Sequence, residues 1–379
     1  MFYPGGLLAE HLHLYTPAFR EIQYAEIKKS FTMPKKPLIP LAFASSFKKT
    51  DAPVTILAGD VGGTKTNLAL YRAGADGIVL LREGRYASQE YTSLADIILQ
   101  FTGTEWPGRI CMAVAGPVND GRVQLTNLSW QLDSTSMSTA LKTPVVFIND
   151  LEANAYGLAG LQSNELATIH ASDKKMPGNI AIVAPGTGLG EAGLYFDGKQ
   201  YHPFATEGGH SDFSPRTEQD IDLFRFLQQQ HGHVSWERVI SGPGIHTLFS
   251  FLTTVERKQI PGWLNEQLQE GDPTPVISNA AIHQKEPVCL EAMHLFVRYL
   301  AMETASLCLK LKATGGCYLS GGIPPKILPL LQTGAWYRHF TDMGRMKNLL
   351  EQMPVYVVLN DKTALLGAAY YGAYNMMSS

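Results

Sequence analysis

The stretch VTILAGDVGGTKTNLALY, residues 54–71, decides the fold. Its apolar, β-branched start predicts a strand, its glycines predict a tight turn, and residues 67–71 predict a returning strand. A second stretch with the same plan, NIAIVAPGTGLGEAGLYF, occupies residues 179–196. Two hairpins that each carry a phosphate-sized glycine turn predict a chain built from two related halves.

The segments between and after the hairpins alternate between strand and helix patterns. A strand is predicted at 109–115 and another at 144–149, and the apolar stripe of Leu151, Ala155, Leu158 and Ala159 predicts a helix directly after it. The remaining segments are predicted as helices at 93–101, 217–230, 235–240, 245–258, 288–312 and 362–374, and as strands at 317–319 and 355–359. This alternation is typical of an α/β fold.

Composition excludes several classes of protein. The chain has 379 residues, 45% of them hydrophobic, which indicates two or three folded domains, and its net charge of −3 disfavours a nucleic-acid binder. No apolar run reaches the ~18–20 residues that span a bilayer, and no signal-peptide pattern opens the chain. The cysteines show no Cys-x-x-Cys pair, so we expect no disulfide framework, no zinc, and a cytoplasmic location; they are Cys111, Cys289, Cys308 and Cys317.

Residues 1–53 form an N-terminal extension of different character. Four prolines between Pro17 and Pro40 interrupt helices, and seven Lys or Arg outnumber four Asp or Glu. We expect a poorly ordered or loosely packed extension, or an upstream start with Met33 as the true beginning. The alternative is a basic arm that binds a partner.

Asp60 with Gly62, Gly63, Thr64 and Lys65 forms the sharpest local signal. Backbone N–H groups of a glycine turn cradle phosphate oxygens, and the carboxylate suits a metal. The alternative is a plain hairpin turn.

In the second hairpin, Gly188, Gly190 and Gly193 match the Gly-x-Gly-x-x-Gly dinucleotide fingerprint, but a returning strand follows where that motif needs a helix. Thr187 and Gly188 are therefore interpreted as a second phosphate clamp.

Three further positions combine polar chemistry with strand ends or turns. Asn149 and Asp150 end an apolar strand before a helix, so Asp150 is either a catalytic group or a helix N-cap. Glu207 and His210 flank two glycines and suit a polar ligand, or else belong to a surface turn. Glu237 follows Ser235 and is explained by default as a first-turn acid.

Six motifs, taken in order, resemble the bacterial glucokinase family of the hexokinase and actin-like superfamily. They are Gly59-Asp-Val-Gly-Gly-Thr, Phe147-Ile-Asn-Asp-Leu-Glu-Ala, Gly186-Thr-Gly-Leu-Gly, Glu207-Gly-Gly-His-Ser-Asp-Phe, the segment from His233 to Gly244, and Leu319-Ser-Gly-Gly-Ile. The resemblance runs from about residue 54 to about residue 374.

The resemblance implies two RNase-H-like domains around a cleft where sugar and Mg-ATP meet. The expected boundaries are a small domain at 54–160 plus 358–379 and a large domain at 161–357. By similarity, Asp60 holds Mg2+ through water, the two glycine turns bind phosphates, and Gly321 and Gly322 lie on the adenosine side. The same similarity makes Asp150 the base and assigns sugar binding to Asn149, Asp150, Glu207, His210 and Glu237.

The implied function is ATP-dependent phosphorylation of glucose to glucose 6-phosphate by a cytoplasmic homodimer. The alternatives are a kinase for mannose, fructose or an amino sugar, a catalytically silent sugar sensor, and, remotely, an NAD-dependent enzyme. The chain lacks the cysteine-rich zinc motif of the related repressor and kinase family. Glu191, just after the second turn, is expected to alter the nucleotide contacts, which leaves the phosphate donor open.

Overall fold

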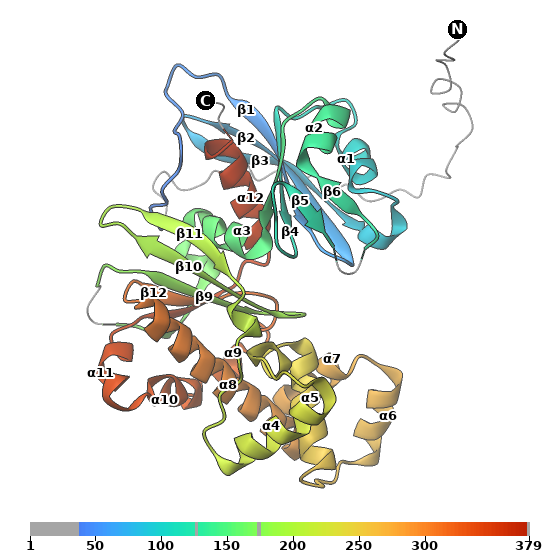
Figure 1. Ribbon diagram of the computed structural model, residues 1–379, viewed down its shortest axis with the longest axis vertical. Helices are drawn as coiled ribbons and strands as arrows, with labels where there is room; N and C mark the ends of the chain where they lie inside the picture. Colours follow the sequence, from blue (N-terminus) through green and yellow to red (C-terminus); the bar gives the residue numbers. More distant parts are fainter. Residues whose placement is uncertain (1–37, 126–127, 173–175, 377–379) are drawn as a thin grey trace. The chain divides into compact units, whose positions relative to one another are not determined.

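The computed structural model describes residues 38–125, 128–172 and 176–376, and two large sheets carry most of its strands (Figure 1). The first sheet has the order β3-β2-β1-β4-β7, with β1 antiparallel to β2 and parallel to β4. A two-stranded ribbon, β5-β6, accompanies it. These strands are β1 (Val54–Val61), β2 (Lys65–Gly74), β3 (Gly77–Ala87), β4 (Arg109–Val114), β5 (Arg122–Gln124), β6 (Gln131–Asp133) and β7 (Val145–Asn149).

The second sheet repeats the plan of the first. In its order β11-β10-β9-β12-β13-β8, the first five strands have the same neighbours and directions as β3-β2-β1-β4-β7, and β8 is added antiparallel at the edge. The predicted pair of related halves is therefore confirmed. The strands are β8 (Leu166–His170), β9 (Ile180–Pro185), β10 (Leu189–Phe196), β11 (Tyr201–Thr206), β12 (Gly316–Leu319) and β13 (Val355–Val358).

Each sheet is buried on both faces, as the continuous apolar runs in β1 and β9 require. Alternate residues of one strand enter different cores: Leu57 packs with the helix α1 side, whereas Ile56 packs with the α3 and α12 side. In β9, Val183 packs in the core that contains α8 (Pro287–Leu311), and Ile182 packs in the core that contains α3. The helices of the first half are α1 (Leu94–Thr102), α2 (Ser134–Leu141), α3 (Asp150–Gly157) and α12 (Thr363–Tyr374).

The predicted helix at 288–312 is confirmed as α8 (Pro287–Leu311), which forms the centre of the largest core. Among the described residues no helix is both long and apolar enough to cross a bilayer. The other helices of this half are α4 (Glu218–His231), α5 (Gly242–Thr254), α6 (Gly262–Glu270), α7 (Pro273–Asn279), α9 (Leu328–Leu331), α10 (Ala335–Thr341) and α11 (Lys347–Leu350).

One predicted helix is wrong. Residues 235–240 form only the 3-10 turn η5 (Trp236–Arg238), because Ser235 makes no side-chain cap and Ser241 caps α5 instead. The other short turns are η1 (Ser88–Glu90), η2 (Leu158–Gly160), η3 (Ser163–Glu165), η4 (Gly208–His210), the π turn η6 (Ala280–Gln284) and η7 (Gly344–Met346).

Helices α3 and α12 lie side by side and touch through glycine (Figure 1). A methyl group on Gly367 would overlap the carbonyl oxygen of Ala153, and one on Gly157 would overlap that of Thr363. Helix α12 also packs on β1 and β4 of the first sheet, while α3 packs on β10 and β11 of the second. The two helices therefore connect the two sheets at backbone contact distance.

Part of the N-terminal extension packs against this helix pair. The ring of Phe43 lies 4.7 Å from that of Tyr374 and 5.9 Å from that of Tyr370, both in α12. The amide of Tyr201 in β11 donates to Pro40 O at 2.9 Å, and Leu41 is buried. Residues 38–53 thus contact elements of both sheets, whereas residues 1–37 lie outside the described part of the chain.

We expect Gly367→Ala to lower the free energy of unfolding by about 1–3 kcal/mol, because the added methyl group must push α3 away from α12. Chemical denaturation monitored by circular dichroism measures this loss. Gly262→Ala is the matched control, since its methyl group meets no atom within 4 Å in α6. Equal stability of both variants would contradict the close helix contact.

Candidate active site

The first glycine turn, residues 59–66, places Asp60 near the carboxyl end of β1. Asn67 donates to the Asp60 carboxylate at 3.3 Å, and the hydroxyl of Ser88 donates to Gly62 O at 2.8 Å. Ser88 is fully buried and supports the turn from the protein interior, whereas Thr64 is exposed. The hairpin is confirmed, and Ser88 is a support that the sequence patterns did not indicate.

Asp60 has an acidic neighbour that the sequence analysis missed. Burial raises the pKa of the Asp60 carboxyl, and the charge of Asp361 raises it further. Asp361 lies three residues after the end of β13, and Asp150 directly follows β7, so an acid close to a strand end was the available signal. No cluster of three metal-ligating side chains occurs among the described residues. Mg2+ fits nonetheless, because it is commonly held by one or two carboxylates, waters and substrate phosphates.

Asp150 is the first residue of α3, and the N-cap is its neighbour Asn149. The Asn149 Oδ1 accepts the amide of Leu151 at 2.8 Å, and its Nδ2 donates to Gly116 O at 3.1 Å. Asn149 and not Asp150 is therefore the N-cap residue, although Asp150 Oδ1 also accepts the amide of Leu151, at 3.0 Å. Burial raises the pKa of Asp150 to about 6, with smaller contributions from the charges of Asp60 and Glu207.

Glu207, His210 and Glu237 come together through backbone bonds between two short turns. The amide of Trp236 donates to Ser211 O at 3.0 Å, which joins η5 to the turn of Glu207 and His210. Both of those side chains are exposed, whereas Glu237 is half-buried. The charge of Glu207 acts on Asp150, so this turn lies near the head of α3.

Glu237 also reaches the second glycine turn. Its Oε2 accepts the amide of Leu189 at 2.9 Å, and a methyl group on Gly188 would overlap the same oxygen. Glu237 is an acid in the first turn of η5, as its default explanation predicts, and it also holds the second glycine turn. The turn runs from β9 into β10 with no helix, which confirms that the Gly-x-Gly-x-x-Gly match is not a dinucleotide motif.

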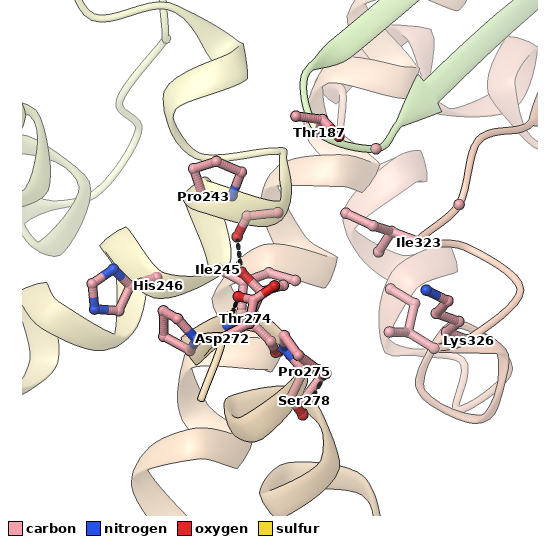
Figure 2. A pocket seen from close by; sticks show the side chains of 15 residues that line it. Thr187, Pro243, Ile245, His246, Asp272, Thr274, Pro275, Ser278, Ile323 and Lys326 are labelled. Atoms are coloured by element: carbon pink, nitrogen blue, oxygen red, sulfur yellow. Dashed lines mark hydrogen bonds between the residues drawn. The ribbon is translucent and has the colours of Figure 1, made fainter. Parts of the chain in front are cut away.

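A cavity of about 640 Å³ opens beside the second turn. Figure 2 shows Thr187 above it, with Pro243 and His246 of α5 on one side and Ile323 and Lys326 on the other. Of the predicted nucleotide residues, Thr187 and Gly322 line this cavity, whereas Asp60, Gly62, Gly63, Thr64, Gly188 and Gly321 are not among its lining residues.

The rest of the cavity wall was not predicted. The hydroxyl of Thr274 in α7 donates to Gly242 O at 2.8 Å, and the amide of Gly242 donates to Gly186 O at 2.8 Å, so α7, α5 and the turn form one wall. The N-terminus of α5 favours anions. The Ser-Gly-Pro-Gly segment that begins α5 was the available signal, whereas Lys326 had none.

Glu191 does not face the nucleotide side, so that expectation is wrong. Its side chain is 1% exposed and lies against Gly208, in the turn between Glu207 and His210. Successive residues of a strand point to opposite faces of the sheet, and in β10 the side chain of Glu191 points to the buried face.

Comparisons with known proteins agree with this architecture. A family model described as Glucokinase matches residues 57–375. The chain belongs to the glucokinase family. The glucokinase of Nostoc punctiforme is 38% identical over 84% of this chain and 98% of its own length, and that of Synechocystis is equally identical with the same coverage.

A solved structure shows the same fold. The glucokinase from an Antarctic psychrotroph is 32% identical, with a TM-score of 0.72 over 84% of this chain and 98% of its own. The glucokinase of Balamuthia mandrillaris, at 20% identity, has a TM-score of 0.68 and supports the fold alone. The expectation of a two-domain actin-like ATPase fold is confirmed for the family, while the exact domain boundaries stay predictions.

We expect Gly188→Ala to destabilise this glucokinase-family chain by about 1–2 kcal/mol, because the methyl group displaces Glu237 from the amide of Leu189. Gly186→Ala, which meets no atom within 4 Å, is the control. The cost of Gly188→Ala should shrink in a Glu237→Ala background, which a double-mutant cycle of unfolding free energies measures. Additive effects would contradict the clash.

Proposed function

We propose that this chain transfers the γ-phosphoryl group of ATP to the 6-hydroxyl of glucose, giving glucose 6-phosphate and ADP. The observation that carries the proposal is Asp150, a partly buried carboxylate at the first residue of α3, where Asn149 is the N-cap. A pKa of about 6 makes it a stronger base than an ordinary Asp while leaving it ionised at neutral pH.

Asp150 would accept the proton of the sugar hydroxyl as the oxygen attacks phosphorus. Exposed Glu207 and His210 and half-buried Glu237 would bind the other hydroxyls, since carboxylates accept hydrogen bonds from sugar hydroxyls. Asn149 donates one amide hydrogen to Gly116 O, so its second amide hydrogen would bind a sugar hydroxyl while its Oδ1 holds the first turn of α3 beside Asp150. Positioning of this kind supplies much of the rate in phosphoryl transfer.

The nucleotide would occupy the cavity beside Thr187 and Gly322, with Lys326 as the cationic side chain in its wall. The glycine turns would present backbone N–H groups to the phosphates, from Gly62, Gly63 and Thr64 on one side and Thr187 and Gly188 on the other. Asp60, with Asp361 beside it, would hold Mg2+. When bound, Mg2+ neutralises charge on the transferred group.

Release of ADP from Mg-ATP by the purified protein tests the proposal, with glucose, mannose, fructose and N-acetylglucosamine offered separately. Glucose-selective turnover supports it, and selective turnover of another sugar changes the substrate but keeps the mechanism. Binding of glucose without any turnover would favour a silent sugar sensor. A homodimer in the cytoplasm stays a prediction, which light scattering tests for the oligomeric state.

We expect Asp150→Asn to bind glucose nearly as well as the unmodified protein and to lose about 10²–10⁴-fold in turnover, because the amide cannot accept the proton. Glucose binding is measured by calorimetry and turnover by ADP release. Asp76→Asn removes one exposed carboxylate from the turn between β2 and β3 and serves as the control. Unchanged turnover in Asp150→Asn would remove Asp150 from the base role.

For Lys326→Met we expect KM for ATP to rise about tenfold while KM for glucose stays the same, because a charge-assisted contact to the nucleotide is lost. Steady-state kinetics with each substrate varied in turn separates the two constants. Lys199→Met, an exposed lysine between β10 and β11, is the control. An equal rise in both KM values would argue against a nucleotide in this cavity.

A further inference from the structure

Two buried carboxyl groups meet behind the turn that carries Glu207 and His210. Glu191 in β10 is 1% exposed and Glu303 in α8 is 0% exposed. Among the described residues, neither side-chain oxygen of Glu191 has a hydrogen-bond donor, and Glu303 has one oxygen without a donor. The other oxygen of Glu303 lies 3.5 Å from Lys310 Nζ. Two buried carboxylates with one ammonium group between them would be costly if both were ionised, so this arrangement calls for a proton on the pair.

Glu191 touches the turn through both its side chain and its backbone. A methyl group on Gly208 would overlap Glu191 Oε2, so the carboxyl lies directly under this glycine. The hydroxyl of Thr206 donates to Glu191 O at 3.0 Å and accepts the amide of Gly208 at 3.1 Å. Movement of the Glu191 carboxyl is therefore transmitted to the residue next to Glu207.

The surroundings favour one proton on the pair. Burial raises the pKa of both carboxyls, and the negative charge of Glu303 raises that of Glu191 further. Lys310 on α8 and the side chain of Trp236 act in the opposite direction on Glu303 and keep it the more acidic member. Cys317 of β12, close to Glu191, is kept neutral because burial raises its pKa, and Cys308 of α8 contacts Cys317.

We propose that Glu191 and Glu303 share one proton, and that the hydrogen-bonded pair is a positioning device that holds the 207–210 turn in its sugar-binding arrangement. Glu191 donates to the Glu303 carboxylate in this state. Loss of the shared proton leaves two adjacent negative charges in the core, and their repulsion displaces Glu191 against Gly208. The inference rests on the proposed sugar-binding role of Glu207 and His210.

The pH dependence of sugar recognition tests the proposal. We expect KM for glucose of the wild-type protein to rise about tenfold between about pH 7 and about pH 9, with a smaller change in kcat. The pKa of Glu191 is raised to about 8, so the protonated fraction falls about tenfold across this range. Glu191→Gln, which mimics the protonated group, should keep a low KM throughout this range. Glu191→Ala should show a raised KM at every pH, because its shape no longer supports the turn.

Glu266→Gln is the matched control, because it removes the same charge from an exposed position on α6. It should show the wild-type pH profile. The same pH profile in Glu191→Gln as in the wild-type protein would overturn the proposal, as would a flat profile in the wild-type protein.

A second measurement needs no sugar. The infrared spectrum of the wild-type protein at neutral pH should contain the carbonyl stretch of a protonated buried carboxyl. Difference spectra between the wild-type protein and each variant should show that Glu191→Gln lacks this band and that Glu266→Gln retains it. In the unfolded chain a glutamate releases its proton near pH ~4.3, whereas the folded protein keeps the shared proton up to the raised pKa of the pair. The free energy of unfolding should therefore fall as pH rises between these two values, with a shallower slope in Glu191→Gln.

The two measurements separate the possible failures. Absence of the infrared band overturns the shared proton whether or not glucose is phosphorylated. A band that depends on Glu191 in a protein that phosphorylates no sugar would instead reject the proposed function. If Glu191→Gln does not fold, Glu303→Gln and the wild-type spectrum test the same proton.

Discussion

The close contact between α3 and α12 is the constraint on which the rest of the structure depends. Gly157 and Gly367 allow the two backbones to touch, and larger residues there would separate the helices. Because α12 packs on β1 while α3 begins with Asp150, this contact fixes the distance between the first glycine turn and Asp150. The proposed base and the proposed phosphate-binding turn are thereby joined through main-chain packing rather than through flexible side chains.

The second half of the chain connects its own turn to the sugar-binding candidates in a similar way. Glu237 accepts the amide of Leu189, so a residue proposed to bind sugar also shapes the turn proposed to bind phosphate. The amide of Gly242, at the start of α5, extends the same connection to the cavity wall. One short network of hydrogen bonds therefore lies between the two proposed substrates, which is a physical route by which binding of one can affect the other.

Carboxyl groups withdrawn from solvent recur around the candidate site, and their surroundings differ. Asp150 keeps its charge and gains basicity from partial burial, whereas Glu191 is so deeply buried that it calls for a proton. The difference follows from solvent access and from neighbours: Asp150 is only partly buried, whereas Glu191 faces Glu303 in the core. Deep burial makes a carboxyl suitable for holding a backbone turn, and partial burial makes it suitable for accepting a proton.

The sequence by itself determined what local chemistry controls: the two glycine hairpins, the α/β alternation, helix α8 and the turn of Glu207 and His210. Apolar periodicity and glycine turns act over a few residues, so they can be read without knowing the fold. Strands with mixed patterns, such as β3 and β8, were missed because their pairing depends on distant neighbours. Only the tertiary structure placed Asp361 beside Asp60, gave the N-cap to Asn149, and turned Glu191 inward, because each depends on contacts between segments far apart in the chain.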